Sequence, residues 1–187
     1  MEVIKTKREA TGSIGYCLLF GMAIIIVMLI MYLMQMSKLM THQHDIDDAL
    51  ADSVLGALVA DDVYYFETYE MTGTPVVRFR NRDEAHRNFV ECMNAAVGNT
   101  QGFYYNFTYV SFIEYEVEGN RVTITTYSGN GGVKSTSYGT LGNVRTPTGK
   151  VVSETSAYAK VQFDIMSILD GSFITKYRDL YCTLEVN

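Results

Sequence analysis

The chain has 187 residues, 48% of them hydrophobic, and a formal net charge of −6 at pH 7. This length allows one domain with a substantial core and excludes two sizeable ones. From residue 13 onward, acidic residues outnumber basic ones by seven. Such an acidic balance argues against nucleic acid as a partner.

The N-terminal region divides into a short basic leader and a long uncharged apolar run. Residues 1–12 carry Lys5, Lys7 and Arg8, and residues 14–36 are almost wholly apolar. As a helix, this run would span roughly 34 Å, enough to cross a hydrocarbon core of about 30 Å. Because lipid offers no water to backbone N–H and C=O groups, the segment must be helical there. We therefore predict a transmembrane helix over residues 13–36.

A cleaved secretory signal is the alternative interpretation of this run. Such signals have an apolar stretch of about 7–15 residues and then a small-x-small cleavage site. The present run is longer and ends at Met36, followed by Ser37 and Lys38, so we expect the helix to be retained. The three basic residues before it place the N-terminus in the cytoplasm and the rest outside the plasma membrane.

An amphipathic helix is predicted over residues 37–60 as a continuation of the apolar run. Its apolar positions recur at steps of seven and then four, the spacing of one helix face, and are Leu39, Ile46, Leu50, Val54 and Leu58. We expect this stripe to pack on the core of an extracytoplasmic α+β domain formed by residues 61–187.

A second helix is predicted after a short tyrosine-rich piece at residues 63–66 and a strand at residues 76–79. Asn81 and Glu84 have the spacing of a capping box at its start, and Gly98 is a natural terminator. The apolar face of this helix would consist of Ala85, Phe89, Cys92 and Ala96.

From residue 104 onward the hydrophobic period changes from that of a helix to that of a strand. Residues 113–118 and 121–125 alternate in polarity around Gly119 and Asn120, which predicts a β-hairpin. Residues 128–149 are rich in Gly, Ser and Thr and are predicted to be loops, followed by strands at 157–165 and 177–186. The fold class is therefore α+β, with a long N-terminal helix and a short helix packed on an antiparallel sheet.

The three cysteines fall in two environments. Cys17 lies in the predicted membrane helix, which leaves Cys92 and Cys182 in a compartment that permits a disulfide. A bond between them across the helix and sheet layers is one interpretation. Two free buried thiols are the other.

The polar clusters of the chain carry no recognisable catalytic or metal site. His42 and His44 point about 200° apart on a helix, so only His44 and Asp48 could share an ion, and we interpret them as a solvated face. His86 is expected on the side of its helix away from the apolar stripe, with no nucleophile at a known spacing. Alternating glutamates at 114, 116 and 118 are interpreted as a solubilising strand face. We expect no enzyme activity, no cofactor and no metal.

The basic leader, the small residues Gly12 and Gly15, the uncharged helix, its amphipathic continuation and the C-terminal sheet together resemble the type IV pilin superfamily. The resemblance is to tight-adherence (Flp-type) pseudopilins and minor pilins of Gram-positive bacteria, and residues 5–60 carry it. It implies a pilin-like fold and leader cleavage by a prepilin peptidase, either between Gly12 and Ser13 or between Gly15 and Tyr16. Family members carry a glutamate at the fifth mature position. Here that position would be Cys17 or Phe20, so the chain departs from the pattern.

Two functions follow from these observations. The first is a structural or assembly subunit of a pilus or secretion apparatus, which contacts the membrane and other pilin-like subunits through residues 14–60 and enters a surface filament. The second is a single-pass anchored extracellular binding or sensor domain with no filament role, which would recognise a ligand through residues 128–149.

Overall fold

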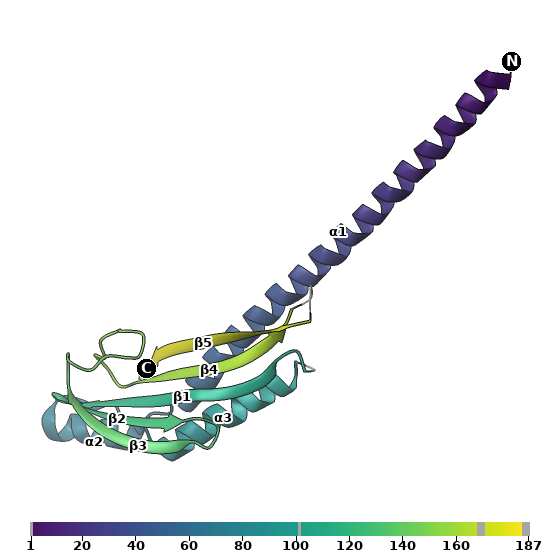
Figure 1. Ribbon diagram of the computed structural model, residues 1–187. Helices are drawn as coiled ribbons and strands as arrows, with labels where there is room; N and C mark the ends of the chain where they lie inside the picture. Colours follow the sequence, from purple (N-terminus) through teal and green to yellow (C-terminus); the bar gives the residue numbers. More distant parts are fainter. Residues whose placement is uncertain (1, 101, 168–170, 185–187) are drawn as a thin grey trace. The chain divides into compact units, whose positions relative to one another are not determined.

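The structure is a computed structural model that describes residues 14–100, 102–167 and 171–184 in full and residues 2–13 by their helical backbone alone. The chain forms two compact units, Met1–Gln43 and His44–Asn187, called unit 1 and unit 2 below. Unit 1 is helical throughout its described length. Unit 2 is an α+β domain in which helices pack on an antiparallel sheet (Figure 1). The predicted fold class is confirmed.

Helix α1 spans Glu2–Ala57, and its last part belongs to unit 2. There, Ile46, Leu50 and Val54 are at most 2% exposed, so the predicted stripe is the face that packs on the core. Of the other two predicted packing residues, Leu39 lies in unit 1 and Leu58 follows the helix end, and both are partly exposed. Ser53 and Ala57 complete the buried face, which the prediction omitted.

Helix α2 spans Asp62–Thr72, where the sequence suggested only a tyrosine-rich piece. Asp61 caps its start, since its carboxylate accepts a hydrogen bond from Tyr64 N at 3.2 Å. Gly73 ends it with a φ of 69°, a conformation that glycine adopts without strain. None of its described residues is buried.

The strand predicted at residues 76–79 is wrong. The segment forms one isolated bridge, between Phe79 and Ala60, and no strand. Two of its backbone N–H groups donate to side chains instead: Val76 N to Thr68 Oγ1 at 3.0 Å, and Phe79 N to Glu116 Oε2 at 3.3 Å.

Helix α3 spans Arg82–Gly98, with the predicted start and end. Asn81 Oδ1 accepts a hydrogen bond from Glu84 N at 3.2 Å, which confirms the predicted N-cap. Its buried residues are Ala85, Phe89 and Met93. Cys92, assigned to the apolar face from the sequence, is exposed instead, because the buried face of α3 contains the neighbouring Met93 in its place.

The sheet has five antiparallel strands in the order β3-β2-β1-β4-β5. Their bounds are β1 Tyr105–Glu118, β2 Arg121–Ser128, β3 Val133–Thr140, β4 Ser156–Met166 and β5 Phe173–Thr183. The predicted hairpin is confirmed, with Glu118 opposite Arg121 and Gly119 at a φ of 56°. Strand β3 lies where loops were predicted, and β5 begins four residues earlier than expected. The last predicted residues of that strand, 185 and 186, lie outside the described residues.

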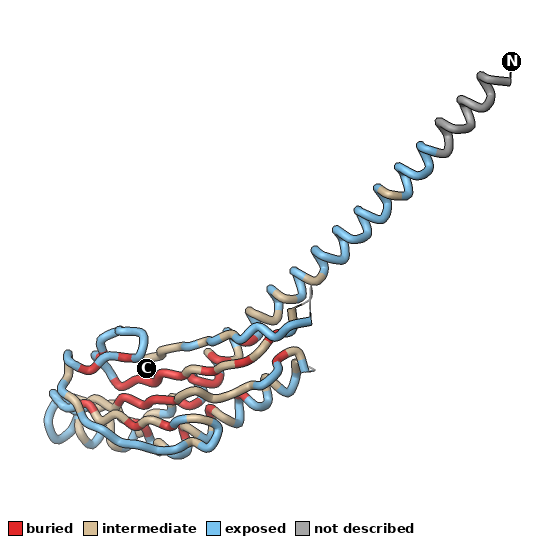
Figure 2. The backbone as a smooth tube through the Cα atoms, in the orientation of Figure 1, coloured by how far each residue is buried: buried red, intermediate tan, exposed pale blue. Residues whose placement is uncertain are grey.

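Buried residues run along the central strands of the sheet (Figure 2), and they form one apolar layer on each face. On one face, Phe112 stacks on Phe89 of α3 with ring centroids 4.7 Å apart. On the other face, a cluster formed by Ile113, Tyr115, Val122, Val144, Val152 and Tyr158 is closed by the connection between β3 and β4. That connection is held in place because Val152 N donates to Val144 O at 3.0 Å. Both faces of the central strands are therefore buried, although the sequence pattern suggested only one.

Candidate functional site

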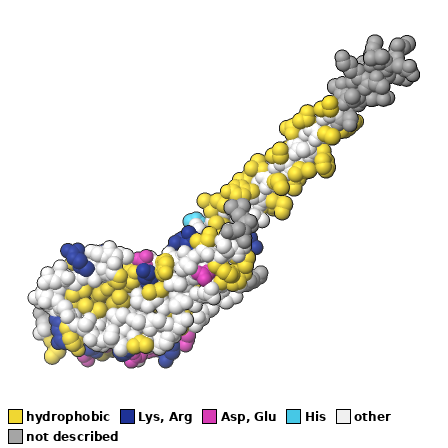
Figure 3. Space-filling model, in the orientation of Figure 1, with side chains coloured by type: hydrophobic (Ala, Val, Ile, Leu, Met, Phe, Trp, Pro, Cys, Tyr) yellow, Lys and Arg dark blue, Asp and Glu magenta, His cyan; other side chains and the backbone are white. Residues whose placement is uncertain are grey.

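Residues 14–36 of unit 1 form a helix whose large hydrophobic side chains are exposed. Hydrophobic side chains cover most of the face of this segment that Figure 3 shows. The stretch Ile14–Ala57 is long and apolar enough to cross a membrane, and its most apolar window has no buried residue. Exposure of an isoleucine or leucine to water costs about 2 kcal/mol relative to burial. Among the described residues of unit 1, nothing covers these side chains, and the helix is compatible with an anchor in a membrane.

A shallow hollow lies along one side of this helix. It is lined by Ile14, Cys17, Leu18, Gly21, Met22 and Ile25. These positions recur at steps of three and four, so they form one helix face. Gly21 leaves the hollow open, because a Cβ placed there would meet nothing within 4 Å. A bare backbone in a ridge of large side chains is the surface that membrane helices use to approach each other closely.

The residues suggested for leader cleavage lie at the start of this helix. Gly12 and Ser13 lie outside the residues whose side chains the structure describes. Gly15 and Tyr16 are within the helix and exposed. Their place in the helix neither creates nor removes a cleavage site, so leader processing stays a prediction.

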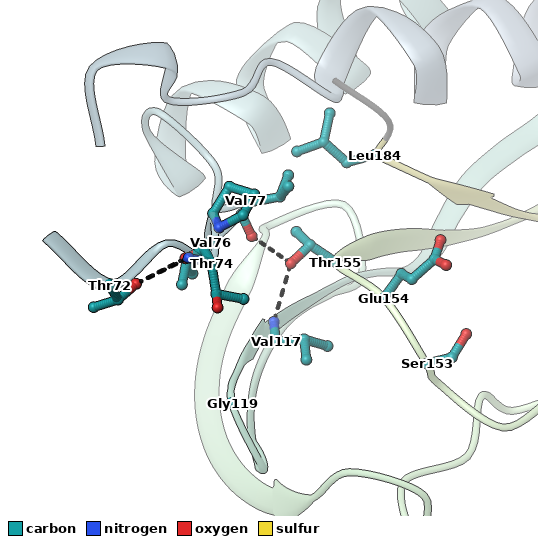
Figure 4. Close-up of a pocket in the computed structure, with 11 residues that line it drawn as sticks. Thr72, Thr74, Val76, Val77, Val117, Gly119, Ser153, Glu154, Thr155 and Leu184 are labelled. Carbon is teal, nitrogen blue, oxygen red and sulfur yellow. Dashed lines mark hydrogen bonds between the residues drawn. The ribbon is translucent and has the colours of Figure 1, made fainter. Parts of the chain in front are cut away.

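A groove of about 640 Å³ lies in unit 2 between the segment after α2 and the ends of the sheet strands (Figure 4). Its walls come from residues 72–77, from Val117 and Gly119 at the hairpin, from residues 153–155 and from Leu184. Thr155 joins the walls, because its hydroxyl donates to Val77 O at 2.5 Å and accepts from Val117 N at 3.1 Å. Among the described lining residues, Glu154 is the one ionisable side chain. The lining thus offers hydrogen-bonding groups and no nucleophile beside a base.

Glu114 is a carboxyl group sealed between α3 and the sheet. The residue is 1% exposed, and neither carboxyl oxygen accepts or donates a hydrogen bond within the described part of the chain. Thr125, directly opposite on β2, is equally buried with its hydroxyl likewise unsatisfied. Burial raises the pKa of Glu114 to about 9, so the group is a neutral acid at pH 7. The interpretation of Glu114 as part of a solubilising face is therefore wrong.

Charged groups surround this acid at the edge of the layer. Arg82 pairs with Glu116 at 2.5 Å, and Lys134 pairs with Asp83 at 2.5 Å. The hydrogen bond from Lys134 lowers the pKa of Asp83, and Tyr127 adds a second one at 2.9 Å. These cations are paired with other carboxylates, which leaves Glu114 without a counter-ion of its own.

His86 faces the sheet rather than solvent. Its ring stacks on Tyr127 at 4.2 Å between centroids with an interplanar angle of 3°, so its expected outward orientation is wrong. Burial lowers the pKa of His86, which keeps the ring neutral at pH 7. A Cβ at Gly132 would lie 2.8 Å from the His86 ring, so the turn before β3 fits closely over it. The histidine is a packing residue here, with no nucleophile against it among its described contacts.

The remaining predicted site residues are not brought together. No group of three metal-ligating side chains occurs among the described residues, and His44 and Asp48 are both exposed. Cys92 and Cys182 are free thiols; Cys92 is exposed and Cys182 is partly buried. Burial raises the pKa of the Cys182 thiol. Their bonding in an oxidising compartment stays a prediction.

No family model, curated protein or solved structure matches the chain. The functional argument therefore depends on the apolar helix of unit 1 and on the surfaces of unit 2.

Proposed function

We propose that the protein is a membrane-anchored, pilin-like subunit of a pilus or secretion apparatus. The observation that carries this proposal is the apolar helix over residues 14–36, which has exposed side chains on all sides and no cover within the described chain. Lipid supplies that cover when the subunit is stored in a membrane. Neighbouring helices of the same kind supply it when subunits assemble.

Charge and fold support the same proposal. Three basic residues precede the apolar run, and Lys38 is the one that closely follows it. This bias favours a cytoplasmic N-terminus with the α+β domain outside. A sheet domain that follows an apolar helix suits a subunit whose helix is packed inside an assembly.

Anchoring and orientation are tested with the exposed Cys92. In the full chain with Cys17 and Cys182 replaced by serine, we expect a membrane-impermeant maleimide to label Cys92 in intact cells. The protein should also stay with membranes after carbonate washing. Labelling that requires cell lysis, or release by carbonate, would contradict the proposed topology or the anchor, respectively.

Assembly is tested at Gly21, the open position of the hollow. Gly21→Leu fills the hollow, whereas Ala23→Leu adds similar bulk about 200° away on the same helix. We expect the wild-type chain and A23L to form oligomers in a gentle detergent and to crosslink through Cys17, and G21L to lose both. A wild-type chain that is monomeric under these conditions refutes the assembly role.

The groove of Figure 4 favours a second candidate, an anchored extracellular binding or sensor domain without a filament role. Its volume of about 640 Å³ lies within the range of small-ligand sites, roughly 300–1,000 Å³. In that case G21L should leave function in cells unchanged. Leucine or tryptophan substitutions in the groove should abolish it.

A further inference from the structure

One end of unit 2 carries a group of exposed apolar and aromatic side chains, which we call the end patch. Its members are Tyr105, Met166, Phe173 and Tyr177, each between 39% and 52% exposed. They are neighbours in the sheet, since Met166 pairs with Phe173 across β4 and β5, and the rings of Tyr105 and Phe173 are 5.1 Å apart. The patch is therefore one surface and not a set of scattered residues.

The end patch lies at the end of unit 2 where the chain enters it. Strand β5 runs alongside α1 in the same direction, because Arg178 pairs with Asp47 at 2.7 Å and, further on, Cys182 lines a hollow with Leu55. From Arg178 back to Phe173 the strand covers about 17 Å. From Asp47 back to His44, the first residue of unit 2, the helix covers about 4.5 Å. The strand thus extends past His44 on the entry side.

Chain length keeps this end near the apolar run whatever the arrangement of the two units. Seven residues, 37–43, separate Met36 from His44. They span about 12 Å as a helix and at most about 28 Å when fully extended. If residues 14–36 lie in a bilayer, the entry end of unit 2 cannot move far from its surface.

We propose that the end patch rests in the interfacial layer of the membrane that holds the helix. Tyrosine, phenylalanine and aliphatic side chains with basic neighbours suit this layer, where rings lie at headgroup depth and lysines reach the phosphates. Lys160 has this role beside Tyr177, with its Nζ 5.1 Å from the ring centroid. The nearby carboxylate of Asp164 is engaged by Asn106 and Thr175, both at 2.7 Å.

A second protein copy fits the end patch less well. Stable protein interfaces use about 20–30 residues on each side, far more than the four members of this patch. A lipid surface needs no matching partner and is already within reach of the chain. This inference depends on the proposed membrane anchoring, so its test must separate the two.

The absence of tryptophan from the sequence provides the test. Three single-tryptophan variants of the full chain are reconstituted in vesicles of phosphatidylcholine and phosphatidylglycerol, with or without bromine on the acyl chains near the headgroup. Phe173→Trp reports on the end patch and Phe20→Trp on the helix. Tyr138→Trp on β3 is the control, because Tyr138 is exposed but lies far from the end patch. Through the strand pairing it is level with Glu116, which is eleven residues along β1 from Tyr105.

We expect brominated lipid to quench the fluorescence of F20W and F173W and to leave that of Y138W unchanged. Quenching of F20W without F173W overturns the inference while the anchor stands. A blue-shifted F173W that brominated lipid does not quench does the same and indicates a second copy at the patch. Loss of quenching in F20W overturns the anchor and the inference together. Quenching of all three variants also overturns the inference, because the contact with lipid is then not specific to the end patch. Met166→Trp repeats the measurement at a second position of the patch.

Discussion

Replacing Glu114 with glutamine should stabilise unit 2, and the gain should grow with pH. The side chain is buried with both oxygens unsatisfied, and burial raises its pKa from 4.5 to about 9. At pH 7 ionisation of this carboxyl group lowers the free energy of the unfolded chain, whereas the folded chain keeps the group protonated. Each pKa unit is equivalent to 1.36 kcal/mol, so the raised pKa of Glu114 lowers the free energy of unfolding at pH 7 by about 3 kcal/mol. Glutamine has the shape of the protonated acid and does not ionise.

The sign of the pH effect follows from the raised pKa. A group that holds its proton more tightly in the folded state contributes its full stability below the unfolded pKa, here 4.5, and loses it as pH rises toward the folded value of about 9. Between about pH 5 and pH 8, the wild-type stability should therefore fall by about 4 kcal/mol relative to that of E114Q. His86 has an effect of opposite sign on stability, because burial lowers its pKa. Its contribution to the free energy of unfolding is lost as pH falls below its ordinary pKa of 6.5.

The assay is guanidinium unfolding of the full chain in mild detergent, followed by near-ultraviolet circular dichroism of the tyrosines. Wild type and E114Q are compared at several pH values, so that groups common to both cancel. Asp61, with a pKa lowered mainly by its hydrogen bond from Arg78, titrates identically in both proteins. Equal stabilities at about pH 8, or a gap that narrows as pH rises, would refute the buried-acid reasoning.

Three further substitutions, the first with a matched control, test the packing of unit 2. Leu50→Ala should lower the free energy of unfolding by about 3 kcal/mol, whereas Leu55→Ala, 56% exposed on the same helix, should change it by less than about 0.5 kcal/mol. Thr155→Val, which leaves Val77 O and Val117 N without their partner, should lower it by about 2 kcal/mol in the same unfolding assay. Asn81→Ala should cost about 1 kcal/mol through the lost N-cap and speed amide exchange in the first turn of α3.

The elements that the sequence predicted well are those in which local pattern and tertiary environment agree. The hairpin at Gly119 has alternation and turn chemistry pointing to the same register, and α3 has a cap at Asn81 that the structure uses. Helix α2 was missed because its Tyr-Tyr-Phe run has strand propensity, which the cap at Asp61 and the terminator at Gly73 override. Strand β3 was missed because an edge strand of small polar residues has no apolar alternation to detect.

Glu114 shows why the polar cluster could not be predicted in the same way. Alternation around β1 correctly separated its two faces, but it could not show that α3 would cover the polar one. The signal that was available lay in the neighbours of the glutamates: Phe112 on the same face of β1, and Tyr127 opposite it on β2, are large and apolar. A face that places aromatic side chains beside a carboxylate is a buried face.

Neither candidate for the fifth mature position, Cys17 or Phe20, is a glutamate, which bears on how subunits would recognise each other in the proposed assembly. A carboxylate in the membrane costs several kcal/mol unless it is paired, so it sets a register only where a partner charge meets it. This chain has Cys17 or Phe20 at the corresponding position, and its apolar helix carries no charge to be paired. Register in an assembly would then depend on shape, and the hollow at Gly21 is the feature of that helix able to provide it.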